Sequence, residues 1–379
     1  MNVGGPSKHV VNLTDGLNNF GCQSILVSGK TNALEGNLYE LASEKNIELR
    51  IIDCMERSVS PIKDFLAFIK ILKIIKEFKP DIIHTHTTKA GILGRLASLF
   101  CSVPKIYHTY HGHIFNSYFN KLISILIIAI ERIFSSFTTK IISLTPNLSN
   151  ELRSILRPKN PDKIVTIPLG LDLKANYLMP RKNNKWRTSM GFSNDDFVVG
   201  IIARLVPVKN HSLLINSMTV LAQRFPDLHL VIVGDGEKRN ELELQVKELG
   251  LKNRIHFCGI IKNLETVYSD LDLLVLCSKN EGTPVCIIEA LASGCPVSAT
   301  DVGGVGELLE KGRLGRLLSL EPNSFLEDLS NAIKDLKENN FKEIPNAKTR
   351  KYISDYYSVD KLARNIFKLY RNKLEDYKT

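Results

Sequence analysis

Short apolar runs rich in β-branched residues alternate with longer segments of helical periodicity, and this alternation constrains the fold more than any other feature. Strands that alternate with helices predict βαβ units, in which the strands are parallel. A first series of runs occupies residues 24–27, 47–52, 81–84, 105–108, 140–144 and 163–167. A second series occupies residues 197–202, 229–233, 255–258, 273–277 and 296–299. The sequence therefore predicts an α/β protein with two doubly wound, parallel-sheet domains.

The segment between the two series, residues 172–194, is rich in Asn, Lys, Arg and Pro and holds the only tryptophan, a composition typical of a linker. A chain of 379 residues also exceeds the roughly 250–300 residues at which a single core stops growing. We therefore expect one domain over residues 1–175 and a second over 190–353. An amphipathic helix pattern follows over about 354–374, with no strand after it.

The net charge of +10, with a pI near 9.1, favours anionic partners: phosphorylated ligands, nucleic acid or an acidic membrane surface. The lysines are not interleaved with aromatic residues as in a nucleic-acid platform, which disfavours nucleic acid. Seven scattered cysteines without a C-x-x-C pair argue against disulfides and structural zinc. The N-terminus has no signal-like pattern, and the longest apolar stretch, 122–130, is short of the ~20 residues of a membrane span. We therefore expect a cytoplasmic protein.

The stretch Glu281-Gly-Thr-Pro-Val-Cys-Ile-Ile-Glu289 directly follows a predicted strand. Thr283 can cap a helix whose first residue is Pro284 and which Gly294 ends. A helix N-terminus after a strand attracts anions, because its free N–H groups and positive dipole end face the ligand. One carboxylate in the loop and one in the helix can hold the hydroxyls of a polyol. Taken alone, two glutamates at this spacing are more often a solvated loop residue and a helix-surface charge than a binding pair.

This stretch, continued by Ala290-Leu-Ala-Ser-Gly-Cys-Pro-Val-Ser-Ala-Thr-Asp-Val-Gly-Gly, resembles the E-x7-E block of family-4 glycosyltransferases. The resemblance covers nearly the whole chain. Further segments that carry it are Gly4-Gly5-Pro-Ser-Lys-His9-Val, Gly200-Ile-Ile-Ala-Arg204-Leu-Val-Pro-Val-Lys209-Asn-His and Leu230-Val-Ile-Val-Gly-Asp-Gly236-Glu. Segments around Asp81–Gly91 and His108–His113 are similar to the acceptor domains of members that build bacterial surface polysaccharides.

The resemblance implies a GT-B fold, with two Rossmann-like domains that face a cleft and a C-terminal helix, within residues 354–379, that crosses back to the first domain. It also implies a retaining transfer of a sugar, of hexosyl or N-acetylhexosaminyl type, from a nucleotide-diphosphate donor, UDP before GDP. The acceptor would be membrane-linked or a saccharide. No metal or other cofactor is expected. A peripheral contact with the inner, anionic face of the membrane stays open beside a purely cytoplasmic location.

Four side chains receive roles from the resemblance. Arg204 and Lys209 would hold the donor diphosphate, which gains charge as the glycosidic bond breaks. Glu289 would bind the ribose hydroxyls, and Glu281 the hydroxyls of the transferred sugar. The alternative for Arg204 and Lys209 is that they are two surface cations near a strand end.

Backbone groups and one imidazole complete the predicted site. The N–H groups of Gly282 and Thr283 would face the diphosphate or the sugar, and Gly4 and Gly5 would allow the diphosphate a close approach. His111 matches the family histidine that faces the transferred sugar near the acceptor. The glycines also fit a plain strand-to-helix turn, and the histidine a buried side chain satisfied by backbone.

Two other patterns could suggest a metal. His84 with His86, and His111 with His113, have H-x-H spacing, but no carboxylate or cysteine nearby completes a ligand set, so we expect none. Asp270-Leu-Asp272 reads as D-x-D but leads into a buried strand, which favours the end of a helix over a metal site.

Residues 62–79 form an apolar helix pattern that carries several lysines, and 115–134 form a second apolar pattern. A helix that covers the sheet with a basic outer face is favoured over a membrane-surface helix for both. Two rival functions stay open: a nucleotide-sugar epimerase on a similar scaffold, and a non-catalytic peripheral membrane scaffold. The second has no reason to keep Arg204, Lys209, Glu281 and Glu289 together.

Only Met1, Asn2 and Val3 precede Gly4, too few for the ~5 residues of a usual strand. In a doubly wound sheet the strand before this glycine turn is central. We therefore expect either a true start further upstream or a gap in the middle of the first sheet. An in-frame extension of roughly 10 to 20 residues ending in an apolar run is expected to improve solubility and activity.

Overall fold

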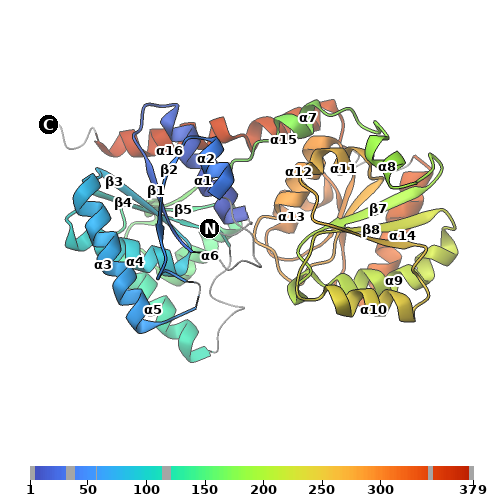
Figure 1. The fold of residues 1–379 in the computed structure, drawn as a ribbon, viewed down its shortest axis with the longest axis horizontal. Helices are drawn as coiled ribbons and strands as arrows, with labels where there is room; N and C mark the ends of the chain where they lie inside the picture. The colour runs from blue at the N-terminus through green and yellow to red at the C-terminus, as the bar shows by residue number, and fades with distance from the viewer. Residues whose placement is uncertain (1–4, 31–38, 57, 113–120, 340–344, 375–379) are drawn as a thin grey trace. The chain divides into compact units, whose positions relative to one another are not determined.

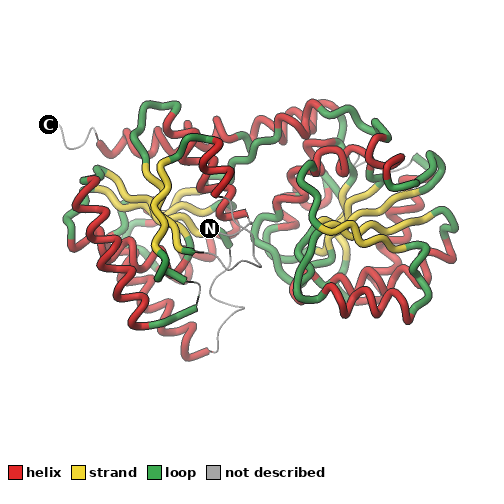
Figure 2. The backbone as a smooth tube through the Cα atoms, viewed as in Figure 1, coloured by secondary structure: helices red, strands yellow, loops and turns green. Residues whose placement is uncertain are grey.

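The computed structural model describes residues 5–30, 39–56, 58–112, 121–339 and 345–374. Contacts divide the chain into two compact units, Met1–Asp172 with Tyr357–Thr379, and Leu173–Tyr356. Each unit has strands in its centre and helices around them (Figures 1 and 2), which confirms the predicted α/β class with two Rossmann-like, parallel-sheet units.

The first unit alternates strands and helices along the chain. Its strands are β1 (Ile25–Gly29), β2 (Glu48–Ile52), β3 (Ile82–His86), β4 (Lys105–Tyr110), β5 (Lys140–Ser143) and β6 (Ile164–Thr166). Its helices are α1 (Gly5–Asn18), α2 (Tyr39–Glu44), α3 (Pro61–Phe78), α4 (Thr88–Phe100), α5 (Lys121–Phe137), α6 (Pro146–Leu156), the 3₁₀ turn η2 (Pro161–Lys163) and α16 (Val359–Leu374).

The strands of the first unit form two parallel sheets: β1 pairs with β2, and β3, β4, β5 and β6 pair in chain order. Among the described residues no strand joins β1 to β3. The interruption lies where the sequence predicts a gap, between the second and fourth strands of a doubly wound sheet.

Helices cover both faces of these sheets. On one side, α3 and α4 pack Ala67, Ile71 and Ala97 into one apolar cluster. On the other side, α1 and α16 pack Leu17, Ile366 and their neighbours against Tyr107 of β4. Figure 1 shows α16 beside α1 in the same unit, so the C-terminal helix returns to the N-terminal unit as the fold class implied. The predicted single helix over 354–374 is wrong in its start, since α15 ends at Tyr356 and α16 begins at Val359.

The second unit holds the remaining elements. Its strands are β7 (Phe197–Ile202), β8 (Leu228–Val233), β9 (Ile255–Gly259), β10 (Leu273–Leu276), β11 (Val297–Thr300) and β12 (Arg316–Leu318). Its helices are α7 (Lys174–Leu178), α8 (Lys185–Ser189), α9 (His211–Arg224), α10 (Arg239–Glu248), α11 (Leu264–Asp270), α12 (Val285–Ser293), α13 (Val305–Leu308), α14 (Pro322–Lys337) and α15 (Ala347–Tyr356), with the 3₁₀ turns η3 (Pro207–Lys209) and η4 (Glu310–Gly312).

The sheet of the second unit is continuous and parallel, with the order β12-β11-β10-β7-β8-β9. This is the doubly wound order in which the first strand lies at the centre. Every residue of β7 and of β10 is buried, because helices cover both faces, and such strands read as apolar runs without alternation. Strand β12 is not among the predicted strands, since a three-residue edge strand that begins with Arg316 gives too short an apolar signal.

Candidate active site

In the sheet of the second unit, β8 pairs with one side of β7 and β10 pairs with the other. The direction in which the chain adds strands to the sheet therefore reverses between β7 and β10. In open parallel sheets, ligands bind outside the carboxyl ends of the strands at such a switch point. The loop after β7 carries Arg204 and, in η3, Lys209; the loop after β10 carries Glu281 and Gly282. The fold thus brings the predicted cations and the first predicted carboxylate to the same edge of one sheet.

Lys209 and Glu281 form an ion pair across the two loops. The Lys209 Nζ lies 2.5 Å from Glu281 Oε1, and the exposed fractions of the two side chains are 20% and 9%. Ser278, two residues after the end of β10, donates its hydroxyl to the same carboxylate oxygen at 2.5 Å. The Glu281 carboxylate is therefore held by Lys209 and Ser278 at the carboxyl ends of β7 and β10.

Arg204 differs from Lys209 in its surroundings. Its side chain is exposed, and no hydrogen bond or ion pair to it is found among the described residues. A guanidinium at a sheet edge that the protein leaves unpaired keeps its donors available for an anion.

Helix α12 carries Glu289, whose Oε2 accepts a hydrogen bond of 2.9 Å from the hydroxyl of Tyr268 in α11. The helix begins at Val285 with Pro284 as its N-cap residue, so the expected cap by Thr283 is wrong by one position. Pro284 has φ −71° and ψ 111°. This backbone conformation is extended, so the first helical residue is Val285. Gly294 ends the helix in the left-handed conformation, with φ 77°, as expected.

The glycines Gly303 and Gly304 let a second backbone segment approach the loop of Glu281. A Cβ at Gly303 would lie 1.9 Å from the Glu281 carbonyl oxygen, and one at Gly304 2.0 Å from that of Gly282. The Gly304 N–H donates to the Glu281 carbonyl at 3.2 Å. This loop has no dinucleotide fingerprint; its glycines hold the Glu281–Gly282 backbone in place.

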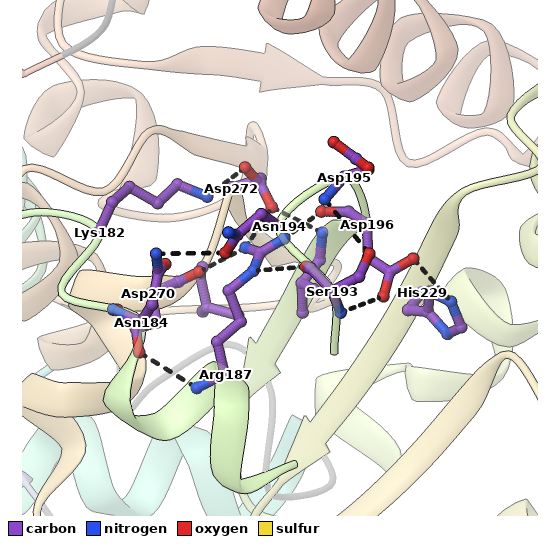
Figure 3. A network of polar contacts seen from close by, with 12 residues as sticks. Lys182, Asn184, Arg187, Ser193, Asn194, Asp195, Asp196, His229, Asp270 and Asp272 are labelled. Atoms are coloured by element: carbon purple, nitrogen blue, oxygen red, sulfur yellow. Dashed lines mark hydrogen bonds and ion pairs between the residues drawn. The ribbon is translucent and has the colours of Figure 1, made fainter. Parts of the chain in front are cut away.

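The carboxylates of the D-x-D pair, Asp270 and Asp272, are bound by groups of the protein itself (Figure 3). Asp270 ends α11, as expected, and its carboxylate accepts the backbone N–H groups of Asn184 and Arg187 at the start of α8. Asp272 pairs with Arg187 at 2.9 Å and with Lys182. Both carboxylates therefore tie α8 to the sheet, and their geometry is not that of a metal site.

In the first unit, parallel pairing brings several histidines together at the carboxyl ends of β3 and β4. His86 is the last residue of β3, and His111 follows β4 directly. The His86 Nδ1 lies 3.0 Å from the His111 Nε2. His9 of α1 joins them, with ring centroids 5.0 Å from His111 and 5.8 Å from His86.

Burial keeps these imidazoles neutral. It lowers the pKa of His111 to about 4 and, with the His111 charge, that of His84 to about 3. Burial and the neighbouring imidazoles hold the pKa values of His9 and His86 well below the usual range. At pH 7 the cluster can donate or accept hydrogen bonds through either ring nitrogen, but it carries no charge.

Some of the predicted site residues have no described position in the structure. Gly4 and His113 are outside the described residues, and so is most of the segment between β4 and α5. Gly5 is the first residue of α1, and the residues that precede it lie outside the described part of the chain.

Comparisons with known proteins agree with the motifs. The model described as "Glycosyltransferase Family 4" matches residues 3–175, and "Glycosyl transferases group 1" matches residues 182–360. The UDP-Gal:alpha-D-GlcNAc-diphosphoundecaprenol alpha-1,3-galactosyltransferase of Escherichia coli is 30% identical over 320 residues, 83% of this chain and 81% of that protein. The chain belongs to the glycosyltransferase family that these two models describe.

Solved structures show that the glycosyltransferase has the GT-B fold. Anabaena Alr3699/HepE in complex with UDP has a TM-score of 0.80 at 21% identity, over 97% of this chain and 96% of that one. The sucrose-phosphate synthase of Thermosynechococcus elongatus has a TM-score of 0.78 at 20% identity, over 97% and 93%. At these identities the likeness establishes the fold alone.

Within the described part of the glycosyltransferase, no helix is both long and apolar enough to cross a membrane.

Three residues that the fold places at these sites are not among the residues predicted from the sequence. Ser278 and Tyr268 each donate to a predicted carboxylate, and His9 lies against the histidine cluster. Ser278 could have been found from its place between a buried strand and Glu281. Tyr268 belongs to no motif, and His9 stands in the glycine-loop segment with nothing that indicates its contacts. Both are distant in sequence from the residues that they contact.

Proposed function

We propose that the chain is a retaining glycosyltransferase that moves a hexosyl or N-acetylhexosaminyl group from a UDP-sugar to a lipid-linked saccharide in the synthesis of a cell-surface polysaccharide. The relative from Escherichia coli is named for UDP-galactose as donor and a diphosphoundecaprenol-linked sugar as acceptor, and the Anabaena structure holds UDP. These two names support UDP over GDP and a membrane-linked acceptor over a free sugar.

The observation that carries the proposal is the convergence at the switch point of the second unit. Arg204, Lys209 and the Glu281–Gly282 loop come from the carboxyl ends of two neighbouring strands, β7 and β10. Cations at this edge can stabilise the negative charge that grows on the departing diphosphate. The carboxylate beside them can accept hydrogen bonds from sugar hydroxyls.

The four side chains have in this proposal the roles that the resemblance implies, and the contacts of three of them support these roles. Arg204 and Lys209 hold the diphosphate, and Lys209 also orients Glu281 toward the transferred sugar through their ion pair. Glu289, held by Tyr268, accepts the ribose hydroxyls. The N–H groups of Gly282 and Thr283 and the glycines 4 and 5 serve the diphosphate, and His111 faces the sugar during transfer.

Transfer by this set of residues requires no metal ion in our proposal. The two cations, Arg204 and Lys209, neutralise the negative charge of the diphosphate. In metal-dependent enzymes a bound Mg²⁺ or Mn²⁺ neutralises this charge. The departing phosphate takes the proton of the attacking hydroxyl on the same face of the sugar, so the anomeric configuration is retained.

A donor screen and a product analysis test the proposal together. UDP- and GDP-sugars are compared by thermal shift, since a ligand that binds only the native state raises the melting temperature by mass action. The best donor is then incubated with a short-chain polyprenyl-diphosphate sugar, and the anomeric configuration of the product is read by NMR. We expect a UDP-sugar to stabilise the protein and to yield a product of unchanged configuration. Conversion of the donor without an acceptor would instead indicate an epimerase, and an inverted product would refute retention.

A further inference from the structure

Three histidines in the first unit form a compact group of ligand atoms. His9 lies in α1, His86 ends β3 and His111 follows β4, and one ring nitrogen of each lies within 4.8 Å of the others. These elements are separate in the chain, so only the fold assembles the group. Among the described residues no other histidine, cysteine or carboxylate set reaches this density.

The hydrogen bonding of the group is incomplete. His9 is 3% exposed, and its Nδ1 has no hydrogen-bond partner among the described residues. A buried polar atom without a hydrogen-bond partner lowers the stability of the fold by about 1–3 kcal/mol. A ligand bound to the His9 Nδ1 would remove this penalty. The neighbouring His84 is different, because its two ring nitrogens lie 2.7 Å from the Tyr370 hydroxyl and 2.7 Å from the Thr109 hydroxyl.

The spacing of the group is near that of a metal site. Zinc bound by imidazole at about 2.0–2.1 Å with tetrahedral angles places two ligand nitrogens about 3.4 Å apart. His86 Nδ1 and His111 Nε2 are 3.0 Å apart, slightly closer than this, and the third nitrogen is within 4.8 Å. Small side-chain rotations would bring all three to one cation.

We propose that His9, His86 and His111 bind one divalent transition-metal cation of the Zn²⁺ type, with water in the fourth position. The proton that His86 and His111 now share moves to the other nitrogen of the ring that holds it. Both facing nitrogens then offer lone pairs, and no proton needs to leave the protein. Three imidazoles favour Zn²⁺, Co²⁺, Ni²⁺ or Cu²⁺ over Mg²⁺ and Ca²⁺, which prefer oxygen ligands.

The cation would inhibit transfer rather than support it, because it occupies the imidazole of His111. This consequence rests on the proposed function, whereas binding of the metal does not. Metal-free transfer and an inhibitory metal site are compatible, since the diphosphate is served by Arg204 and Lys209 in the other unit.

Binding is measured on the full chain freed of metal by chelation and dialysis. Titration with Co²⁺ is followed by visible absorption, which is intense for four-coordinate Co²⁺, and bound Zn²⁺ is counted by elemental analysis. We expect one ion per chain, displaced by Zn²⁺ but not by Mg²⁺. His9→Gln and His86→Gln should each weaken binding at least ~10-fold.

Two matched variants serve as controls. His84→Gln removes a neighbouring imidazole whose nitrogens are already bonded, and His256→Gln removes one member of the His229–His256 pair, 3.2 Å apart, in the second unit. Both should bind Co²⁺ as the unmodified chain does. Melting curves establish that each variant is folded, and zinc should raise the melting temperature of the unmodified chain but not of His9→Gln.

The outcomes separate the two proposals. No saturable binding, or binding that survives both His9→Gln and His86→Gln in folded protein, overturns the metal site. Binding that both substitutions abolish supports it. If that bound Zn²⁺ leaves the transfer rate unchanged, the metal site stands and the role of His111 in transfer is refuted.

Discussion

At the scale of single residues, the site of the second unit depends on charges held at a sheet edge. Lys209 is paired with Glu281, whereas Arg204 is exposed and unpaired among the described residues. Lys209 therefore fixes a carboxylate, whereas the guanidinium donors of Arg204 are available to an anion. Both are expected to act on the same diphosphate.

Arg204→Ala and Lys209→Ala should each lower turnover at least ~10²-fold, because each removes charge stabilisation from the leaving diphosphate. Steady-state transfer rates with a saturating acceptor measure the effect. Arg224→Ala is the matched control, since Arg224 pairs with Glu327 on the surface of α9 and α14, and its rate should stay normal. Near-normal rates in both test variants would refute the assigned role.

Glu281 and Glu289 should divide the donor between them. Glu289→Ala should weaken the binding of UDP itself, because its carboxylate would accept the ribose hydroxyls. Glu281→Ala should leave UDP affinity almost unchanged and weaken the binding of the intact UDP-sugar. Calorimetric titration of each variant with UDP and with UDP-sugar gives both affinities, and an equal loss of UDP affinity in the two would contradict this division.

At the scale of elements, α3 has two apolar faces. Ala67, Ile71 and Ile75 are buried against the unit, while Ile62, Phe65, Leu66 and Ile69 are spaced along an opposite face and are 77%, 63%, 50% and 45% exposed. Exposed lysines flank this second face: Lys63, Lys70, Lys73 and Lys76. Helix α3 therefore covers the sheet, as expected, and also offers the combination that binds an anionic membrane surface.

We expect the unmodified chain to sediment with vesicles that contain phosphatidylglycerol, and less with pure phosphatidylcholine vesicles or at high salt. Phe65→Ser combined with Ile69→Ser should reduce the bound fraction several-fold, because it removes the apolar residues that enter the lipid. The matched control is Leu244→Ser on α10 with Leu249→Ser directly after it, residues that are 53% and 38% exposed. If the α3 and α10 variants sediment alike, α3 does not contact the membrane.

Helix α9 gives a pH-dependent contribution to stability. Burial and the Lys209 cation lower the pKa of His211, its first residue, to about 4. Since the unfolded chain titrates near 6.5, it binds more protons than the native state between these values. The free energy of unfolding therefore decreases as the pH falls below about 6.5, by roughly 2 kcal/mol at pH 5 from this residue.

Replacement of His211 with Gln removes this titration. Calorimetric melting at pH 7.5, 6.5, 5.5 and 5 should show a smaller loss of melting temperature in His211→Gln than in the unmodified chain. Parallel pH profiles for the two proteins would show that His211 does not contribute.

At the scale of the whole molecule, two units with separate cores divide the residues of the proposed reaction. The cations and carboxylates belong to the second unit, and the histidine cluster belongs to the first. The two sheets differ as well: in the second unit β7 fills the central place, whereas no described strand joins β1 to β3 in the first. The gain in solubility and activity from an upstream extension stays a prediction.

Transfer should survive an excess of EDTA, because the diphosphate is met by Arg204, Lys209 and a helix N-terminus without Mg²⁺. EDTA can even raise the rate if the histidine group has retained zinc during purification. A rate measured with EDTA and then with added Mg²⁺ or Mn²⁺ decides the matter. Loss of activity with EDTA and recovery with either ion would overturn the metal-free mechanism.

The sequence by itself determined the fold class and most strands, because strands buried on both faces, such as β7 and β10, read as continuous apolar runs. It also placed Glu281 in a loop and Glu289 in a helix, since the apolar run before Glu281 and the helix signals at Pro284 and Gly294 are local. Tertiary structure alone decided which of these residues contact one another: Lys209 with Glu281, Tyr268 with Glu289, and His9 with His86 and His111. Strand order sets these contacts, and strand order depends on packing between segments far apart in the chain, which no local pattern records.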